Sequence, residues 1–175
     1  MDLPWESLEI AKLGVSLVTP VLVLILGIII NNSIKTSERA TALRSEIYKT
    51  VGGDLNDIYS YLAFVGCWKE MTPLEIIAKK RAVDKAMYTY KPFFSNELFH
   101  TYETFMEEAF APYGGSGKDA RIRSDISTAD GDRQSHSKEW EVEWGDRFTK
   151  ERNKLAQDQA YNRFLEQLAR DLALK

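Results

Sequence analysis

The chain has 175 residues, of which 44% are apolar and 28% are charged, a composition that excludes a globally disordered protein. Its formal net charge is −3, so it lacks the basic field that nucleic-acid binding normally requires, and nucleic acid is not an expected partner. Cys67 is the single cysteine, which excludes an intrachain disulfide. The length allows one domain and an anchor.

An apolar segment lies near the N-terminus, where residues 13–30 (LGVSLVTPVLVLILGIII) contain no charged side chain. As a helix rising ~1.5 Å per residue, this segment is roughly 27 Å long, close to the ~30 Å hydrocarbon core of a bilayer. A cleaved signal peptide is disfavoured because the preceding residues are acidic and the segment ends in Ile-Ile-Ile-Asn-Asn. A buried core helix would rarely be apolar on every face. The segment therefore predicts a single transmembrane helix.

Basic residues are distributed unequally around this segment. Lys12 precedes it, and four basic residues follow within twenty positions: Lys35, Arg39, Arg44 and Lys49. The positive-inside rule then predicts that residues 1–12 form a short extracytoplasmic N-terminus and that the rest of the chain lies in the cytoplasm. The expected location is the inner (plasma) membrane, with the lipid bilayer as one partner.

One face of the predicted span carries small or weakly polar residues. Ser16, Pro20, Val23 and Gly27 recur at steps of four, three and four, so they share a helix face. Such a face allows two membrane helices to approach closely, which favours self-association. An ordinary lipid-facing anchor, in which Pro20 only introduces a kink, is the alternative.

After the span, residues 31–53 predict a juxtamembrane helix that breaks or bends at the Gly52-Gly53 pair. Asp54 is expected to cap a further helix that ends near Met71, and this helix begins a cytosolic helical domain over residues 54–175.

Two helix starts follow in this domain. Thr72-Pro73-Leu74-Glu75 predicts a capping box, and Pro92 ends the helix that it begins. Ser95 then caps another helix, whose predicted buried stripe contains Leu98, Tyr102, Phe105, Met106 and Ala109.

The rest of the domain, residues 111–174, divides into a polar segment and a segment with helical periodicity. Residues 111–136 are rich in Gly, Ser and Asp and predict a flexible loop. From residue 137 to 174 a single long helix is expected, because Trp140, Trp144 and Phe148 follow at steps of four. No strand is predicted. The expected fold class is all-α: one N-terminal transmembrane helix followed by an antiparallel helical bundle with one long C-terminal helix.

No motif predicts a catalytic, cofactor or metal site. Gly115, Gly117 and Ala120 satisfy a dinucleotide-binding pattern, but that pattern requires a preceding strand. Asp130-Gly131-Asp132 lacks the alternating oxygen ligands of a calcium loop, and His100 and His136 lack a second ligand at helical spacing. Cys67 is expected to be a buried structural residue.

Aromatic residues are dense between positions 88 and 113. Core packing is their default role, and a partner surface is the alternative, with four candidates: Tyr88, Tyr90, Phe93 and Tyr113.

These features predict a membrane-anchored helical interaction module, not an enzyme, that acts by protein association at the inner membrane face and self-assembles or binds a protein partner. Three other interpretations fit the same sequence. The first is a membrane-perturbing effector of bacterial anti-phage defence, the second a membrane-tethered enzyme that uses the loop over residues 111–136, and the third a small subunit of a larger membrane complex.

Overall fold

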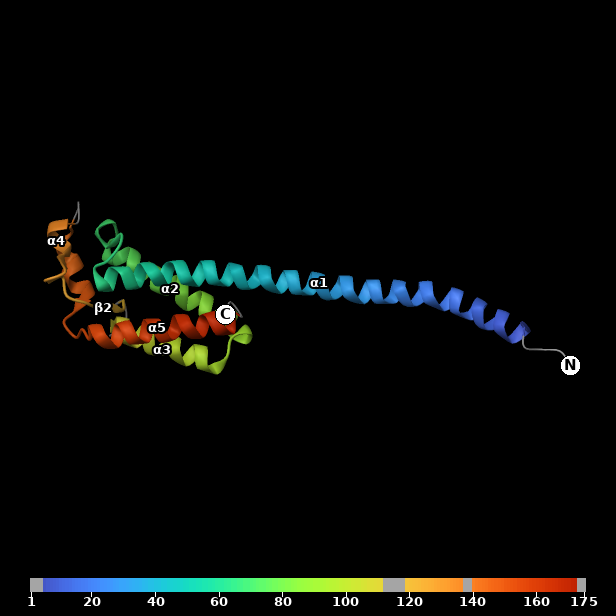
Figure 1. Cartoon of the computed structure of the whole chain (residues 1–175). Helices are drawn as coiled ribbons and strands as arrows, with labels where there is room; N and C mark the ends of the chain where they lie inside the picture. Colours follow the sequence, from blue (N-terminus) through green and yellow to red (C-terminus); the bar gives the residue numbers. More distant parts are fainter. Residues whose placement is uncertain (1–4, 112–118, 137–139, 173–175) are drawn as a thin grey trace. The chain divides into compact units, whose positions relative to one another are not determined.

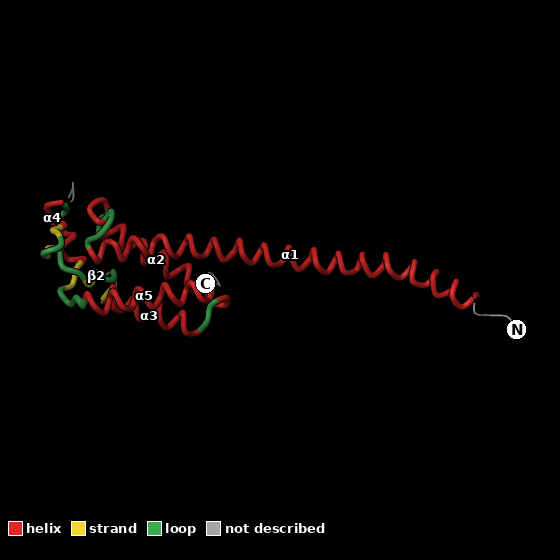
Figure 2. The backbone as a smooth tube through the Cα atoms, in the orientation of Figure 1, coloured by secondary structure: helices red, strands yellow, loops and turns green. Residues whose placement is uncertain are grey.

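The computed structural model describes residues 5–111, 119–136 and 140–172, with side chains of the first range from residue 22 on, residue 36 excepted. This part of the chain is mostly helical, as the sequence predicts (Figure 1, Figure 2). The chain divides into two compact units, Met1–Arg44 and Ser45–Lys175.

Helix α1 spans Trp5–Ala63, so the predicted break at Gly52-Gly53 is wrong. The reason is a buried face in which Val51, Leu55, Ile58 and Leu62 are at most 1% exposed. Burying each of these side chains is worth ~1.5 to 3 kcal/mol, whereas a helical glycine costs only about 1 kcal/mol. The predicted helix end near Met71 is also wrong.

Helix α1 ends where the backbone turns left-handed. Phe64 and Gly66 have φ angles of +61° and +60°, a conformation that commonly terminates helices. Cys67 lies in the turn that follows and is exposed, so the prediction of a buried cysteine is wrong. A short 3-10 helix, η1 (Trp68–Glu70), then leads to α2.

Helix α2 spans Pro73–Tyr90, and its predicted capping box is confirmed. The Glu75 backbone N–H donates to Thr72 Oγ1 at 3.2 Å, and the Thr72 N–H donates to Glu75 Oε2 at 2.7 Å. The 3-10 helix η2 (Lys91–Phe93) follows, so α2 ends before Pro92 as predicted.

Replacing Thr72 by alanine is expected to lower the free energy of unfolding by about 1 kcal/mol, because the side-chain half of the capping box is lost. Urea titration of the protein in mild detergent measures the change. Thr89→Ala, at an exposed position of the same helix, is the control. Equal stability of the two variants would contradict a capping role for Thr72.

Helices α3 (Asn96–Ala109) and α5 (Lys154–Asp171) lie side by side (Figure 1). The Ser95 cap is confirmed, since its Oγ accepts from Leu98 N at 3.1 Å, and the predicted stripe of α3 is buried. The carboxylate of Asp171 accepts from the N–H and the hydroxyl of Ser95. The start of α3 therefore meets the end of α5, so the two helices are antiparallel.

The part of α1 that belongs to the second unit packs on its neighbours through specific pairs. The rings of Tyr59 and Tyr161 stack at 3.9 Å, which joins α1 to α5. Lys79 Nζ lies 2.9 Å from carboxylate oxygens of Asp54 and Asp57, which joins α2 to α1. Together with α3, these helices form a bundle.

The predicted long helix over residues 137–174 is wrong in its N-terminal half, because α5 begins only at Lys154. Asn153 caps it by accepting from Ala156 N at 3.1 Å. The aromatic residues at steps of four pack on one another instead: Trp140 meets Trp144 at 5.6 Å and Phe148 at 6.1 Å. Trp140 lies in an irregular segment, Trp144 in the 3-10 helix η3 (Val142–Arg147) and Phe148 in strand β5 (Phe148–Thr149).

Short strands are present, although the sequence predicts none. Strand β2 (Arg121–Arg123) pairs antiparallel with β1 (Phe110–Ala111) and parallel with β5, while β3 (Ser127–Thr128) and β4 (Gly131–Asp132) form a hairpin. Helix α4 (Arg133–His136) follows. Residues 119–136 are therefore structured, which corrects the predicted flexible loop for this stretch. Residues 112–118 lie outside the described residues.

Gly131 is required by close packing rather than by calcium. A Cβ atom at this position would lie 2.7 Å from Trp68 Cζ2 and 2.9 Å from Phe64 Cδ1. Gly131→Ala is therefore expected to cost about 1 to 3 kcal/mol of stability, as over-packing does. Gly53→Ala is the control, because a Cβ there meets nothing within 4 Å, and it should stabilise α1 by ~0.5 to 1 kcal/mol. Thermal unfolding distinguishes the two, and a neutral Gly131→Ala would refute the close contact.

Among the side chains that the structure describes, no helix offers a stretch long and apolar enough to cross a membrane. The predicted span of residues 13–30 lies only partly among them, because the side chains of residues 13–21 are outside this set. The transmembrane helix therefore stays a prediction.

Candidate functional sites

The apolar part of α1 in the first unit is exposed. Every large apolar side chain from residue 22 to 30 is 47% to 65% exposed: Leu22, Val23, Leu24, Ile25, Leu26, Ile28, Ile29 and Ile30. Successive residues of a helix are rotated by about 100°, so nine consecutive positions cover all its faces. An amphipathic helix on a protein surface would be apolar on one face only. This segment is instead apolar all round.

Two members of the predicted association face can be located in this segment. Val23 is 63% exposed, and a Cβ built on Gly27 would meet nothing within 4 Å. The side chains of Ser16 and Pro20 lie outside the described set.

At its other end, α1 is held by two arginines from the C-terminal part of the chain. Arg133 Nη2 donates to the Tyr61 carbonyl at 2.7 Å, and Arg152 Nη2 donates to the Leu62 carbonyl at 3.2 Å. Carbonyls in the last turn of a helix have no partner within the helix and carry partial negative charge. The two cations therefore cap α1.

Arg133 is buried among aromatic rings and is only 2% exposed. Its guanidinium lies 3.9 Å from the ring centre of Tyr61 and 3.8 Å from that of Phe64. Burial lowers the pKa of Arg133 to about 10 and raises the pKa of Tyr61 to about 12. The arginine remains charged at neutral pH and fixes β4 and α4 to the end of α1.

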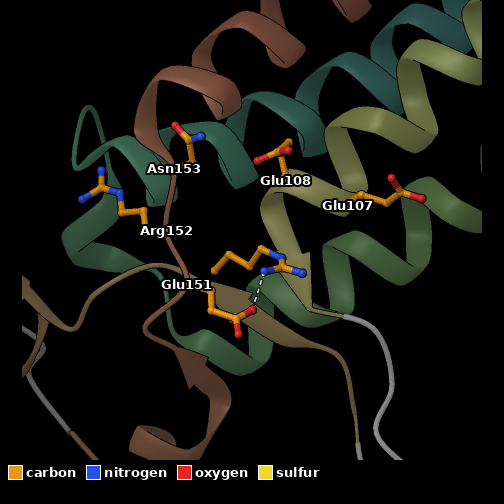
Figure 3. Close-up of a pocket in the computed structure, with 6 residues that line it drawn as sticks. Glu107, Glu108, Glu151, Arg152 and Asn153 are labelled. Atoms are coloured by element: carbon orange, nitrogen blue, oxygen red, sulfur yellow. Dashed lines mark hydrogen bonds and ion pairs between the residues drawn. The ribbon is translucent and has the colours of Figure 1, made fainter.

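A polar hollow of about 480 Å³ lies in the second unit, between α3 and the segment that precedes α5. Figure 3 shows Glu107 and Glu108 on one side of it, and Arg152 and Asn153 on the other. The dashed line in Figure 3 marks the 2.7 Å ion pair between Glu151 Oε2 and Nη1 of Arg123, which also lines the hollow.

The walls of this hollow are joined by Gln157, a residue of α5 that is 2% exposed. Its Nε2 donates at 2.8 Å both to the carbonyl of Glu108 and to that of Arg123. The end of α3 and strand β2 are therefore held on either side of one amide nitrogen. A second hollow of about 560 Å³ adjoins the first, since Glu107 and Arg123 line both; its apolar lining is Met106, Phe110, Ala111 and Ala120.

The predicted aromatic partner surface is partly exposed. Tyr88 is 60% and Phe93 64% exposed, whereas Tyr90 is half-buried and Tyr113 lies outside the described residues. Lys91 Nζ lies 5.9 Å from the ring centre of Tyr88. Whether a partner binds here stays a prediction.

Where the structure describes the chain, no group of three His, Cys, Asp or Glu residues could hold a metal ion. His136, in α4, has its Nδ1 2.8 Å from the carbonyl oxygen of Asp132 in β4, and His100 is exposed on α3. Most of the glycine-rich dinucleotide pattern falls on residues 112–118, outside the described set.

Sequence reasoning missed Arg133, Arg152 and Gln157. Each acts through an isolated contact with distant backbone, so no local spacing predicts it.

Comparison of the chain with protein families, with curated proteins and with solved structures finds no match. The functional argument therefore rests on the chain's own residues.

Proposed function

We propose that the chain is a single-pass membrane protein that displays a helical interaction module at the inner face of a membrane and acts there by association, including association with itself. The observation that carries the proposal is the helix surface at residues 22–30, which is apolar and exposed on every side. Hydrocarbon solvates such a helix from all directions, whereas a protein groove covers one face.

The sequence around this segment supports the same interpretation. The eighteen residues 13–30 carry no charge, and the basic residues follow the segment rather than precede it. This arrangement favours a cytoplasmic second unit. The near-neutral net charge and the absence of any recognisable catalytic motif in the sequence favour a binding role over catalysis.

Self-association is proposed to use the face that contains Val23 and Gly27. Gly27→Leu should weaken self-association about tenfold, equivalent to ~1.4 kcal/mol, because it prevents close helix approach. A Cβ atom at this position meets nothing within 4 Å, so folding should be unaffected. Crosslinking in native membranes, followed by quantification of dimers and higher species, measures the effect.

The control is Ile25→Phe, which adds bulk on the opposite face of the same helix and should leave the crosslinked fraction unchanged. A wild-type chain that is monomeric in native membranes would overturn the self-association part of the proposal. Equal loss of crosslinking in both variants would show that the Gly27 face is not the contact.

A further inference from the structure

We propose that the outer face of α2 binds a second copy of this chain, which presents the outer face of its α3. The proposal rests on the self-association at a membrane proposed above, and it adds a second contact, made by the helical module rather than by the span. Because the two faces differ, the contact is heterologous: each copy uses α2 on one neighbour and α3 on another, so assemblies larger than dimers form.

The outer face of α2 is basic and partly apolar. Its exposed residues follow at steps of four and three and share one side of the helix: Leu74, Ala78, Arg81, Lys85 and Tyr88. Leu74 is 43% and Tyr88 60% exposed. The Arg81 side chain is 64% exposed and pairs with Asp119, whereas Lys85 forms no ion pair with any described residue. A face that combines an exposed tyrosine, an arginine and apolar side chains is typical of protein interfaces.

The outer face of α3 is acidic. Glu97, Glu103 and Glu107 are exposed on it, together with His100, and the helix contains no lysine or arginine. None of the three glutamates forms an ion pair within the part of the chain that the structure describes. These carboxylates therefore complement the charge of the α2 face.

The spacing of the charges also matches. Arg81 and Lys85 are four residues apart, as are Glu103 and Glu107, so each pair spans about 6 Å along its helix. Two helices packed side by side can therefore place both opposite-charge pairs in register. If α2 met α2, or α3 met α3, like charges would face each other, and such pairings are penalised. Only the pairing of α2 with α3 is favoured.

The two outer faces do not meet within one chain. Helices α2 and α3 of the same chain are joined through other residues, since the hydroxyl of Tyr102 donates to the carboxylate of Asp84. Tyr102 is only 3% exposed, so this contact lies on the inner side of α3. Both outer faces are left for a second copy.

Reversal of the two charges, followed by restoration, tests the contact by crosslinking of the full-length chain in native membranes. Ala78→Glu, Lys85→Glu makes the α2 face acidic, and Glu103→Lys, Glu107→Lys makes the α3 face basic; all four positions are exposed. Each double variant alone should lower the amount of species larger than dimers at least tenfold, because like charges then face each other. Co-expression of the two should restore these species to within about twofold of the wild type, since opposite charges meet again at every contact.

The control is Asn162→Glu, Arg163→Glu, which changes the net charge by the same amount at exposed positions of α5 and should leave the larger species unchanged. The single variants Lys85→Glu and Glu107→Lys give a milder pair with the same expected restoration, in case a double variant does not fold. A wild type that forms only dimers, an equal loss in the α5 control, or no restoration in either pair would overturn the α2–α3 contact. Dimers that disappear in Gly27→Leu would persist in each of these results, so the span contact is tested separately.

Discussion

Replacing Arg133 by leucine is expected to lower the free energy of unfolding by about 3 kcal/mol. Three buried or half-buried acceptors lose a hydrogen bond from the guanidinium: the carbonyls of Tyr61 and Asp125 and the hydroxyl of Ser124. Of these, only the Asp125 carbonyl keeps another donor among the described residues, Ser124 Oγ at 3.4 Å. Each unsatisfied acceptor costs about 1 to 3 kcal/mol, and the contact of the cation with two aromatic rings is lost as well. Part of this loss of stability is offset, because the substitution also removes a buried positive charge that its surroundings neutralise only partly. The expected net change is still among the largest for a single substitution in the second unit.

Urea titration of the full-length protein in mild detergent measures this loss of stability. Two further variants test whether the loss is specific to the contacts of Arg133. Arg163→Leu removes an exposed arginine of α5 and should change stability by less than about 0.5 kcal/mol. Arg133→Lys keeps the charge, but its single ammonium nitrogen cannot occupy the Nε and Nη2 positions together, so it should be destabilised nearly as much as Arg133→Leu. A lysine variant as stable as the wild type would show that charge alone matters. A leucine variant as stable as the Arg163 control would remove the capping role.

The second large effect concerns the membrane. Lysine substitutions at Leu22, in the middle of the predicted span, and at Leu26, one helical turn further along it, should release the chain from membranes. Each charged residue at the centre of a membrane helix costs ~2.5 to 3.5 kcal/mol, so the pair disfavours insertion by about 5 kcal/mol. At ~1.4 kcal/mol for each tenfold change, the partition should shift more than a thousandfold. The measurement is the fraction of Leu22→Lys, Leu26→Lys protein in the membrane pellet after cell lysis.

The double alanine variant Leu22→Ala, Leu26→Ala is the matched control. It removes the same two leucine side chains but leaves the segment uncharged, so it should remain in the pellet. If the lysine and alanine variants fractionated alike, the segment would not be solvated by lipid, and the proposed function would lose its main support.

Local signals predicted much of the helical part of this fold. The capping box at Thr72, the cap at Ser95 and the end of α2 before Pro92 are all confirmed, because each depends on contacts within a few residues of sequence. The buried stripe of α3 is confirmed for the same reason, since the period of the helix places these residues on one face.

Tertiary packing determines the structure of the elements for which the prediction from sequence is wrong. The Gly52-Gly53 pair remains helical because its apolar neighbours on α1 are buried. Trp140, Trp144 and Phe148 follow a helical spacing but cluster outside a helix. The described strands contain only two or three residues, too few to show the alternation that identifies a strand. The polar hollow depends on pairing across long sequence separations, as between Gln157 and Glu108, which no local pattern encodes.

Alkaline carbonate extraction of vesicles that contain the wild-type chain is the most direct test of the proposed function. Carbonate removes peripheral proteins and leaves spanning helices in place. The account predicts that the chain stays with the vesicles and requires detergent for release. Recovery of the chain in the carbonate supernatant, or as a stable monomer in detergent-free buffer, would contradict it.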